Sequence, residues 1–192
     1  SFLEGRLLLD IKGGVFITTT NFRIIEKIHD YYDYMMLYHY SQQIDYLHKV
    51  FLEQAAAILY TNNQKEAAEE VFGHYKEGYA DDKIDFETFI STSLYKTLHN
   101  ETGKSRRALI ESSLFQAFNW LATGDVQRSI GYANFAKLVW ERHQRLHSDN
   151  PSTKLPPFEN FVKSAYSKVM DSQIAPEFKK RLSENMELKE FD

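Results

Sequence analysis

Two short motifs place side chains that could do chemistry on one face of a helix. Glu26 and His29 form a Glu-x-x-His pair, the spacing that di-iron four-helix proteins use for two of their ligands. Such a site needs a second copy and further glutamates, so we interpret this single pair as solvent-facing. His143 and His147 are one helical turn apart, and a third ligand would complete a zinc site. Arginines flank them and no Glu follows His143, so we interpret them as an exposed helix end.

Residues 31–40 form an unusually aromatic run. The run indicates either a pocket for a flat apolar ligand such as heme, with His39 as axial ligand, or a buried helix whose hydroxyl groups reach polar partners. We expect the buried helix, because rings at helical spacing usually face a core. The sequence shows no nucleophile elbow, no glycine-rich phosphate loop and no complete ligand set. We therefore predict no catalytic residue, no cofactor and no metal.

A set of mostly basic side chains could form one surface around the fifth and sixth predicted helices. We predict that this surface binds a protein partner, with Arg142 and Arg145 facing solvent. An RNA-binding surface is a minor alternative, because the net charge is −4 and nucleic-acid binders usually carry a positive excess. The predicted binding residues are Arg106, Arg107, Asn134, Lys137, Arg142 and Arg145.

Helices must position these residues. From Asn21 onward, apolar residues recur mainly at the spacing of an α-helix. The first helix is apolar nearly all round, so we expect it to lie at the centre of the fold. The sequence predicts an all-α chain of seven or eight antiparallel helices, arranged as a bundle or a helical repeat. The expected helices cover residues 22–40, 42–60, 64–79, 84–99, 105–121 and 126–147, with further helices after Pro157 and Pro176.

Residues 1–20 differ from the rest of the chain. An apolar run, Lys12-Gly13-Gly14 and a β-branched run indicate a short β-hairpin, or equally a short helix followed by an extended arm. We therefore divide the chain into an N-terminal arm or hairpin, residues 1–20, and a single helical domain, residues 21–192. Asn21 and Ser105 can cap the helices that follow them, and residues 148–153 form the clearest predicted loop.

Residues 114–137 resemble one tetratricopeptide repeat, a pair of antiparallel helices. The matching residues are Ala117, Trp120, Gly124, Asp125, Ser129, Ala133 and Ala136. The small side chains would let the two helices approach closely, and Gly124-Asp125 would form the turn. Leu114 and Phe118 stand at positions of the family's peptide-carboxylate clamp, so that clamp is not carried over. The resemblance implies a scaffold that binds a peptide or a partner helix in a groove.

Composition limits the remaining classes. The 192 residues are 43% hydrophobic and include no cysteine, so the chain can bury a core and cannot use disulfides or thiolate ligands. No apolar run approaches the ~20 residues of a membrane helix, and no signal peptide is visible, so we expect an intracellular location. The sequence thus favours a non-catalytic helical interaction module. The alternative is an all-α enzyme or ligand-binding protein with a heme-type or di-iron-type pocket in helix 22–40.

Overall fold

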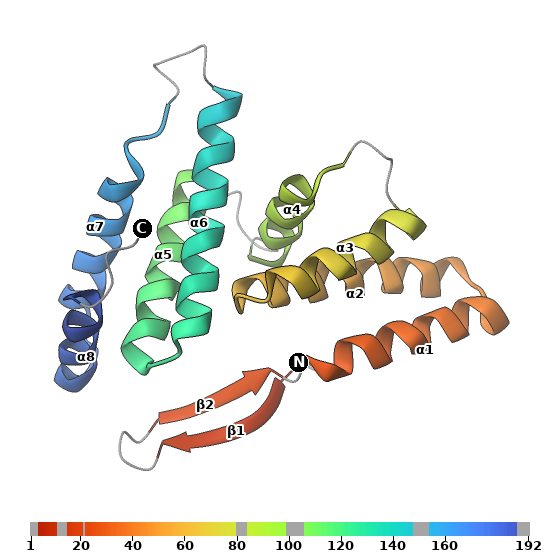
Figure 1. Cartoon of the computed structure of the whole chain (residues 1–192), viewed down its shortest axis with the longest axis horizontal. Coiled ribbons are helices and arrows are strands. Elements are labelled where there is room, and N and C mark those ends of the chain that lie inside the picture. The colour runs from red at the N-terminus through yellow and green to blue at the C-terminus, as the bar shows by residue number, and fades with distance from the viewer. Residues whose placement is uncertain are drawn as a thin grey trace.

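A computed structural model describes residues 4–10, 15–20, 22–79, 84–98, 106–147 and 154–187. This part of the chain is mainly α-helical (Figure 1), which confirms the predicted class and helix number. No helix in it is both long enough and apolar enough to cross a membrane. Ahead of the helices, strands β1 (Glu4–Asp10) and β2 (Val15–Thr20) pair antiparallel. The helices are α1 (Arg23–His39), α2 (Gln42–Thr61), α3 (Lys65–Tyr79), α4 (Phe86–Leu98), α5 (Arg106–Thr123), α6 (Val126–Leu146), α7 (Phe158–Asp171) and α8 (Pro176–Glu187).

Local sequence determines where several helices begin. The Ser41 hydroxyl accepts a hydrogen bond of 3.2 Å from the amide of Ile44 and so caps α2. Asp125 caps α6 in the same way, through a 3.0 Å hydrogen bond from the Arg128 amide. Pro176 is the first residue of α8, a position that needs no amide donor. The predicted features that lie outside the described residues are the turn at 12–14, the caps Asn21 and Ser105, and the loop at 148–153.

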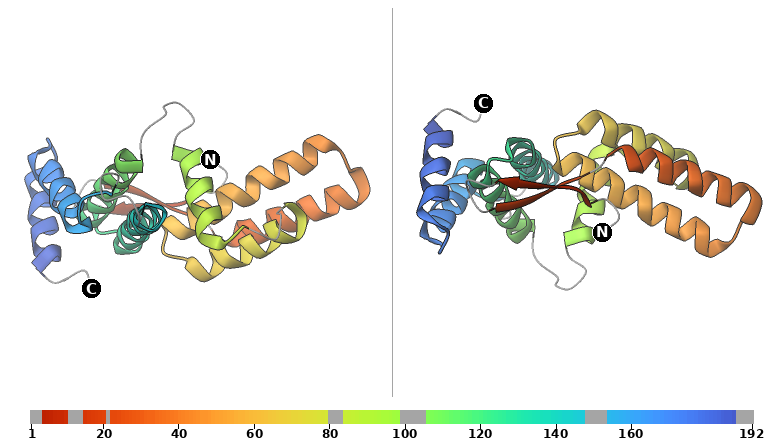
Figure 2. Two further views of the ribbon diagram at one scale, coloured as in Figure 1. Left: turned by 90° about the horizontal axis from the view of Figure 1, so that it is seen from above. Right: turned by 90° about the horizontal axis from the view of Figure 1, so that it is seen from below.

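The helices form two groups that meet through α2, α4 and α6. In the first group α2 packs against α1, α3 and α4, and in the second α5 packs against α6, α7 and α8. Figure 1 shows α5, α6 and α7 standing roughly upright, while α1, α2 and α3 extend to one side of them, roughly at right angles. In the views from above and below, α1 and α2 project at one end of the molecule and α7 and α8 lie at the other (Figure 2).

Aromatic and aliphatic side chains fill the interior of both groups. The largest fully buried ones include Phe89, Phe118 and Phe135. Apolar residues that recur at helical spacing in the sequence form the inward face of α5, and all of them are buried: Leu109, Ile110, Leu114, Ala117, Phe118 and Leu121.

Helix α1 does not lie at the centre, so that prediction is wrong. Ile25 is the one residue of α1 that is buried. The helix lies at the edge of the first group, where α2 packs against one side of it. The error arose from counting tyrosine as a core residue, although its ring and hydroxyl suit a surface that is partly wet.

Candidate functional site

Arg142 and Arg145 connect α6 to α4. The half-buried Arg142 donates hydrogen bonds to the Ser91 hydroxyl and, at 3.4 Å, to the Glu87 carbonyl oxygen. Arg145 is exposed and forms an ion pair with the Glu87 carboxylate. The prediction that Arg142 faces solvent is therefore wrong, because α4 approaches α6 from a part of the chain that helical spacing in α6 does not reveal.

The other four predicted binding residues are exposed and lie on α5 and α6. Arg107 pairs with Glu111 one turn later, at 3.1 Å, and its guanidinium group lies 5.7 Å from the ring centre of Phe161. Arg106 lies at the start of α5, while Asn134 and Lys137 are exposed on α6. The six residues thus do not form one uniform basic face, since three of the five cations are engaged in ion pairs or hydrogen bonds to carboxylate, hydroxyl or carbonyl groups.

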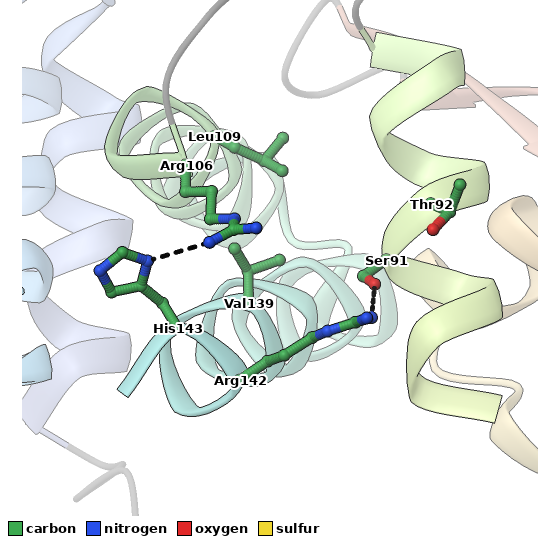
Figure 3. A pocket seen from close by; sticks show the side chains of 7 residues that line it. All are labelled: Ser91, Thr92, Arg106, Leu109, Val139, Arg142 and His143. Atoms are coloured by element: carbon green, nitrogen blue, oxygen red, sulfur yellow. Dashed lines mark hydrogen bonds between the residues drawn. The ribbon is translucent and has the colours of Figure 1, made fainter. Parts of the chain in front are cut away.

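A cavity of about 340 Å³ lies between α4, α5 and α6 (Figure 3). Two of the predicted binding residues line it, and the Nη1 atom of Arg106 lies 3.5 Å from Nδ1 of His143 across it. Its floor is apolar and its walls carry two guanidinium groups and hydroxyl groups. The lining residues include Ser91, Arg106, Leu109, Val139, Arg142 and His143.

The aromatic run is divided between the two faces of α1. Its outer face carries large side chains in water: Tyr31 is 59% exposed, Tyr34 52%, Leu37 75% and Tyr38 63%. The rings of Tyr34 and Tyr38 pack together with centres 4.7 Å apart. The expected buried helix is wrong for these residues, because all four are exposed. We call Tyr31, Tyr34, Leu37 and Tyr38 the aromatic face of α1.

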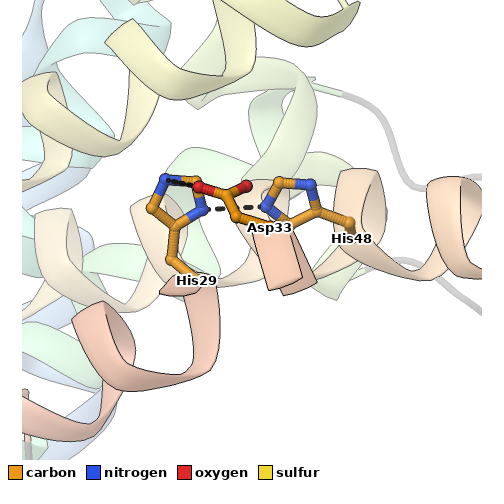
Figure 4. Close-up of side chains that lie close together, drawn as sticks. All are labelled: His29, Asp33 and His48. Atoms are coloured by element: carbon orange, nitrogen blue, oxygen red, sulfur yellow. Dashed lines mark hydrogen bonds and ion pairs between the residues drawn. The ribbon is translucent and has the colours of Figure 1, made fainter. Parts of the chain in front are cut away.

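The inner face of α1 brings His29 against side chains from α2 (Figure 4). Its Nδ1 atom lies 2.9 Å from Nε2 of His48, which is buried, and its Nε2 atom lies 3.6 Å from a carboxylate oxygen of Asp33. The ligand atoms of these three residues all lie within 4.8 Å of one another. Figure 4 shows the Asp33 carboxylate beside the gap between the two imidazole rings.

Groups from α1 and α3 complete the surroundings of this cluster. The Nδ1 atom of His48 lies 2.8 Å from the hydroxyl oxygen of Tyr79, which in turn donates to the sulfur of Met36 at 3.6 Å. The ring centre of His74 lies 4.0 Å from that of His29. We call His29, Asp33 and His48 the His–Asp–His cluster, with Tyr79 and His74 as its neighbours.

Burial dominates the protonation of these groups. Removal from water lowers the pKa of His29, and the positive charge of His74 lowers it further. Burial and the charge of His29 lower the pKa of His48 in the same way. Burial and the Asp45 carboxylate raise the pKa of Tyr79 well above its ordinary value. Near pH 7 the two imidazoles are therefore neutral and the phenol keeps its proton.

A second cavity, of about 270 Å³, leads to the cluster between α1, α2 and α3. Glu26 and His29, the pair found in the sequence, both line it, and Glu70 and His74 of α3 line it as well. The Glu-x-x-His pair therefore faces this cavity, which corrects our interpretation of His29 as solvent-facing. Residues 31–40 do not line this cavity.

His143 and His147 stack with ring centres 4.1 Å apart at the end of α6. His147 hydrogen-bonds through Nδ1 to the carbonyl oxygen of His143, at 2.9 Å. In the part of the chain that the structure describes, the group of His, Asp and Glu side chains close enough to share an ion is the His–Asp–His cluster, not this pair.

Sequence reasoning missed His48, His74 and Tyr79. They lie on α2 and α3, at separations of 19 or more residues from His29, and no local spacing links them to it. One available signal was the position of His48 in the predicted helix 42–60, directly after Leu47 and three residues before Phe51. Comparison of this chain with protein-family models, with curated proteins and with solved structures finds no match.

Proposed function

We propose that this chain is a non-catalytic helical module that binds a protein partner through the aromatic face of α1. The observation that carries the proposal is the exposure of Tyr31, Tyr34, Leu37 and Tyr38 on the side of α1 that faces away from α2. Tyrosine supplies a large apolar area and a hydroxyl group at low entropic cost, and it is enriched where proteins meet.

The position of α1 supports this assignment. The helix lies at one end of the molecule, so a partner can approach the aromatic face without meeting α5 to α8. Its inner face is held by contacts of Tyr32 with Phe51 and His48, at ring-centre distances of 5.6 Å and 5.1 Å. A helix anchored on one side presents its outer side chains in a defined arrangement, which reduces the entropy lost on binding.

The partner that fits this face is a different protein whose contact segment carries apolar side chains. The basic residues give weaker support to RNA binding, because Arg107, Arg142 and Arg145 already interact within the chain. Asn134 and Lys137 are exposed and form a second candidate contact.

The same proposal includes two further points: α5 and α6 form a tetratricopeptide-like hairpin, and the protein is located inside the cell. Helices α5 and α6 pack against each other, and the turn between them places Gly124 at a φ of +90°, which favours glycine. Such a hairpin would act as the rigid support from which α1 and α2 project.

Site-specific photocrosslinking in the native host tests the proposal. A photoreactive phenylalanine at position 38 should yield an adduct with one other protein, and the same residue at position 146 should not. Leu146 is the matched control, since it is 60% exposed and lies on α6. Replacing Tyr34 with Ala should reduce the binding free energy of the partner by more than about 1 kcal/mol. Adducts formed only with a second copy of this chain, or equally from both positions, would contradict the proposal.

A further inference from the structure

The His–Asp–His cluster is part of one chain of polar contacts that runs from Tyr79 to Asp33. The Tyr79 hydroxyl oxygen lies 2.8 Å from Nδ1 of His48, a shorter contact than its 3.6 Å contact with the sulfur of Met36. Either Tyr79 or Nδ1 of His48 can be the donor of that bond, because each group can donate or accept. The Asp33 carboxylate only accepts, so Nε2 of His29 carries the hydrogen that faces it, and Nδ1 of neutral His29 carries a lone pair.

Nδ1 of His29 and Nε2 of His48 face each other across 2.9 Å. A hydrogen on Nε2 of His48 can lie between the two nitrogen atoms, with the Tyr79 hydroxyl donating to Nδ1 of the same ring. A metal ion can replace that hydrogen, since metal-bound histidines use one ring nitrogen and donate the other N–H to a carboxylate or a comparable acceptor. The ligand atoms of His29, His48 and Asp33 all lie within 4.8 Å of one another, as a shared ion requires.

We propose that His29, His48 and Asp33 bind a divalent transition-metal ion of the zinc class, bridging α1 and α2. Imidazole nitrogen and carboxylate oxygen are ligands that zinc accepts. Two nitrogen atoms bound to tetrahedral zinc lie about 3.3 Å apart, so the rings need to separate by only a few tenths of an ångström. A carboxylate oxygen of Asp33 lies within 4.8 Å of the ligand nitrogen atoms of both histidines, so the carboxylate can supply the third ligand.

The surroundings of the cluster satisfy the further requirements of such a site. The Tyr79 hydroxyl oxygen lies 2.8 Å from Nδ1 of His48, where it can accept the Nδ1–H bond when Nε2 binds the ion, as the hydrogen-bond partners of metal-bound histidines do. The cavity between α1, α2 and α3 gives an ion a path to His29, and His74 on the cavity wall or a water molecule would fill the fourth position. The proposal goes beyond partner binding, because the ion would hold α1 on α2 whether or not a partner is present.

The test uses the whole chain without a histidine tag, stripped with EDTA and dialysed. Calorimetric titration with Zn²⁺ should show one equivalent bound, and Co²⁺ should give the visible absorption of a tetrahedral nitrogen–oxygen site. His29→Gln should abolish both signals, and Asp33→Asn should weaken Zn²⁺ binding about 10–100-fold. Asp33 is the safer variant for folding, because its side chain is 54% exposed, and circular dichroism would verify that both variants stay helical.

The matched control is the double variant His143→Gln, His147→Gln, which removes the stacked pair on α6 and should leave Zn²⁺ binding unchanged. The proposal is overturned if zinc fails to bind, if His29→Gln binds it as tightly as the parent chain, or if the control variant loses it. It is also overturned if nitrogen NMR of the parent chain, with zinc added, shows a proton shared between His29 and His48.

Discussion

Gly131 of α6 lies directly against the backbone carbonyl of Thr61 at the end of α2, and a Cβ atom at position 131 would overlap with that carbonyl oxygen. The same Cβ atom would lie 2.8 Å from the backbone nitrogen of Asn63. Beside this contact, Arg128 donates a 2.9 Å hydrogen bond to the side-chain oxygen of Asn62. The two helix groups thus meet where the end of α2 rests on α6, and glycine makes that approach possible.

We expect Gly131→Ala to lower the free energy of unfolding by about 1–3 kcal/mol, because the added methyl group meets backbone atoms that cannot move independently. Gly73→Ala on α3 is the matched control, since nothing lies within 4 Å of the added methyl group. The control should stabilise the chain by about 0.5–1 kcal/mol through helix propensity. Urea denaturation of the two variants measures the difference, and equal effects would show that α2 and α6 are not in contact here.

Arg142→Ala should destabilise the chain by about 1–2 kcal/mol, because it removes hydrogen bonds that connect α6 to Ser91 and Glu87 of α4. The exposed Lys137 on the same helix provides the comparison, and Lys137→Ala should change stability by less than about 0.5 kcal/mol. Thermal melting followed by circular dichroism distinguishes the two. If neither variant lowers the melting temperature, the hydrogen bonds of Arg142 to α4 do not contribute to stability.

Ala136→Leu should overpack the interface of α6 and cost about 1–3 kcal/mol, because Ala136 is completely buried. Ala133, which the tetratricopeptide resemblance also places between α5 and α6, is only half-buried. Its enlargement to Leu should therefore cost less than the change at position 136. The reverse order in chemical denaturation would mean that α6 is rotated about its axis relative to α5.

Stability should fall at alkaline pH, and Tyr60 should account for part of the fall. Burial raises the pKa of Tyr60 from 10.0 to about 12, and the nearby Glu87 carboxylate adds to the shift. The unfolded chain then loses this proton first, so the stabilisation is complete below pH 10 and is lost as the pH rises toward 12. The slope from one such group reaches at most about 1.4 kcal/mol per pH unit.

Tyr60→Phe should reduce that slope, whereas Tyr46→Phe should not, because the ring of Tyr46 is exposed. Denaturation of each variant at a series of pH values between neutral and alkaline measures the slope. An unchanged slope in Tyr60→Phe would show that the phenol is not buried in the folded chain.

Part of the candidate site was within reach of the sequence. Helical spacing identified the pair Glu26 and His29, and the structure places both on one cavity wall. Spacing could not find His48, because hydrogen bonds between side chains of different helices leave no period in the sequence. It also placed the tyrosines of residues 31–40 in the interior, since hydrophobic periodicity does not distinguish a face that is covered from one that is bare.

The sequence by itself determined the class of the fold, the number of helices in the described residues and the inward face of α5, because these follow from local spacing, capping and turn residues. Tertiary structure alone decided that α1 lies at an edge, that Arg142 hydrogen-bonds to α4, and that His29 contacts His48. The physical reason is that these relations depend on which helix faces which, and they are decided by close contacts such as that of Gly131 with Thr61, between residues far apart in the chain.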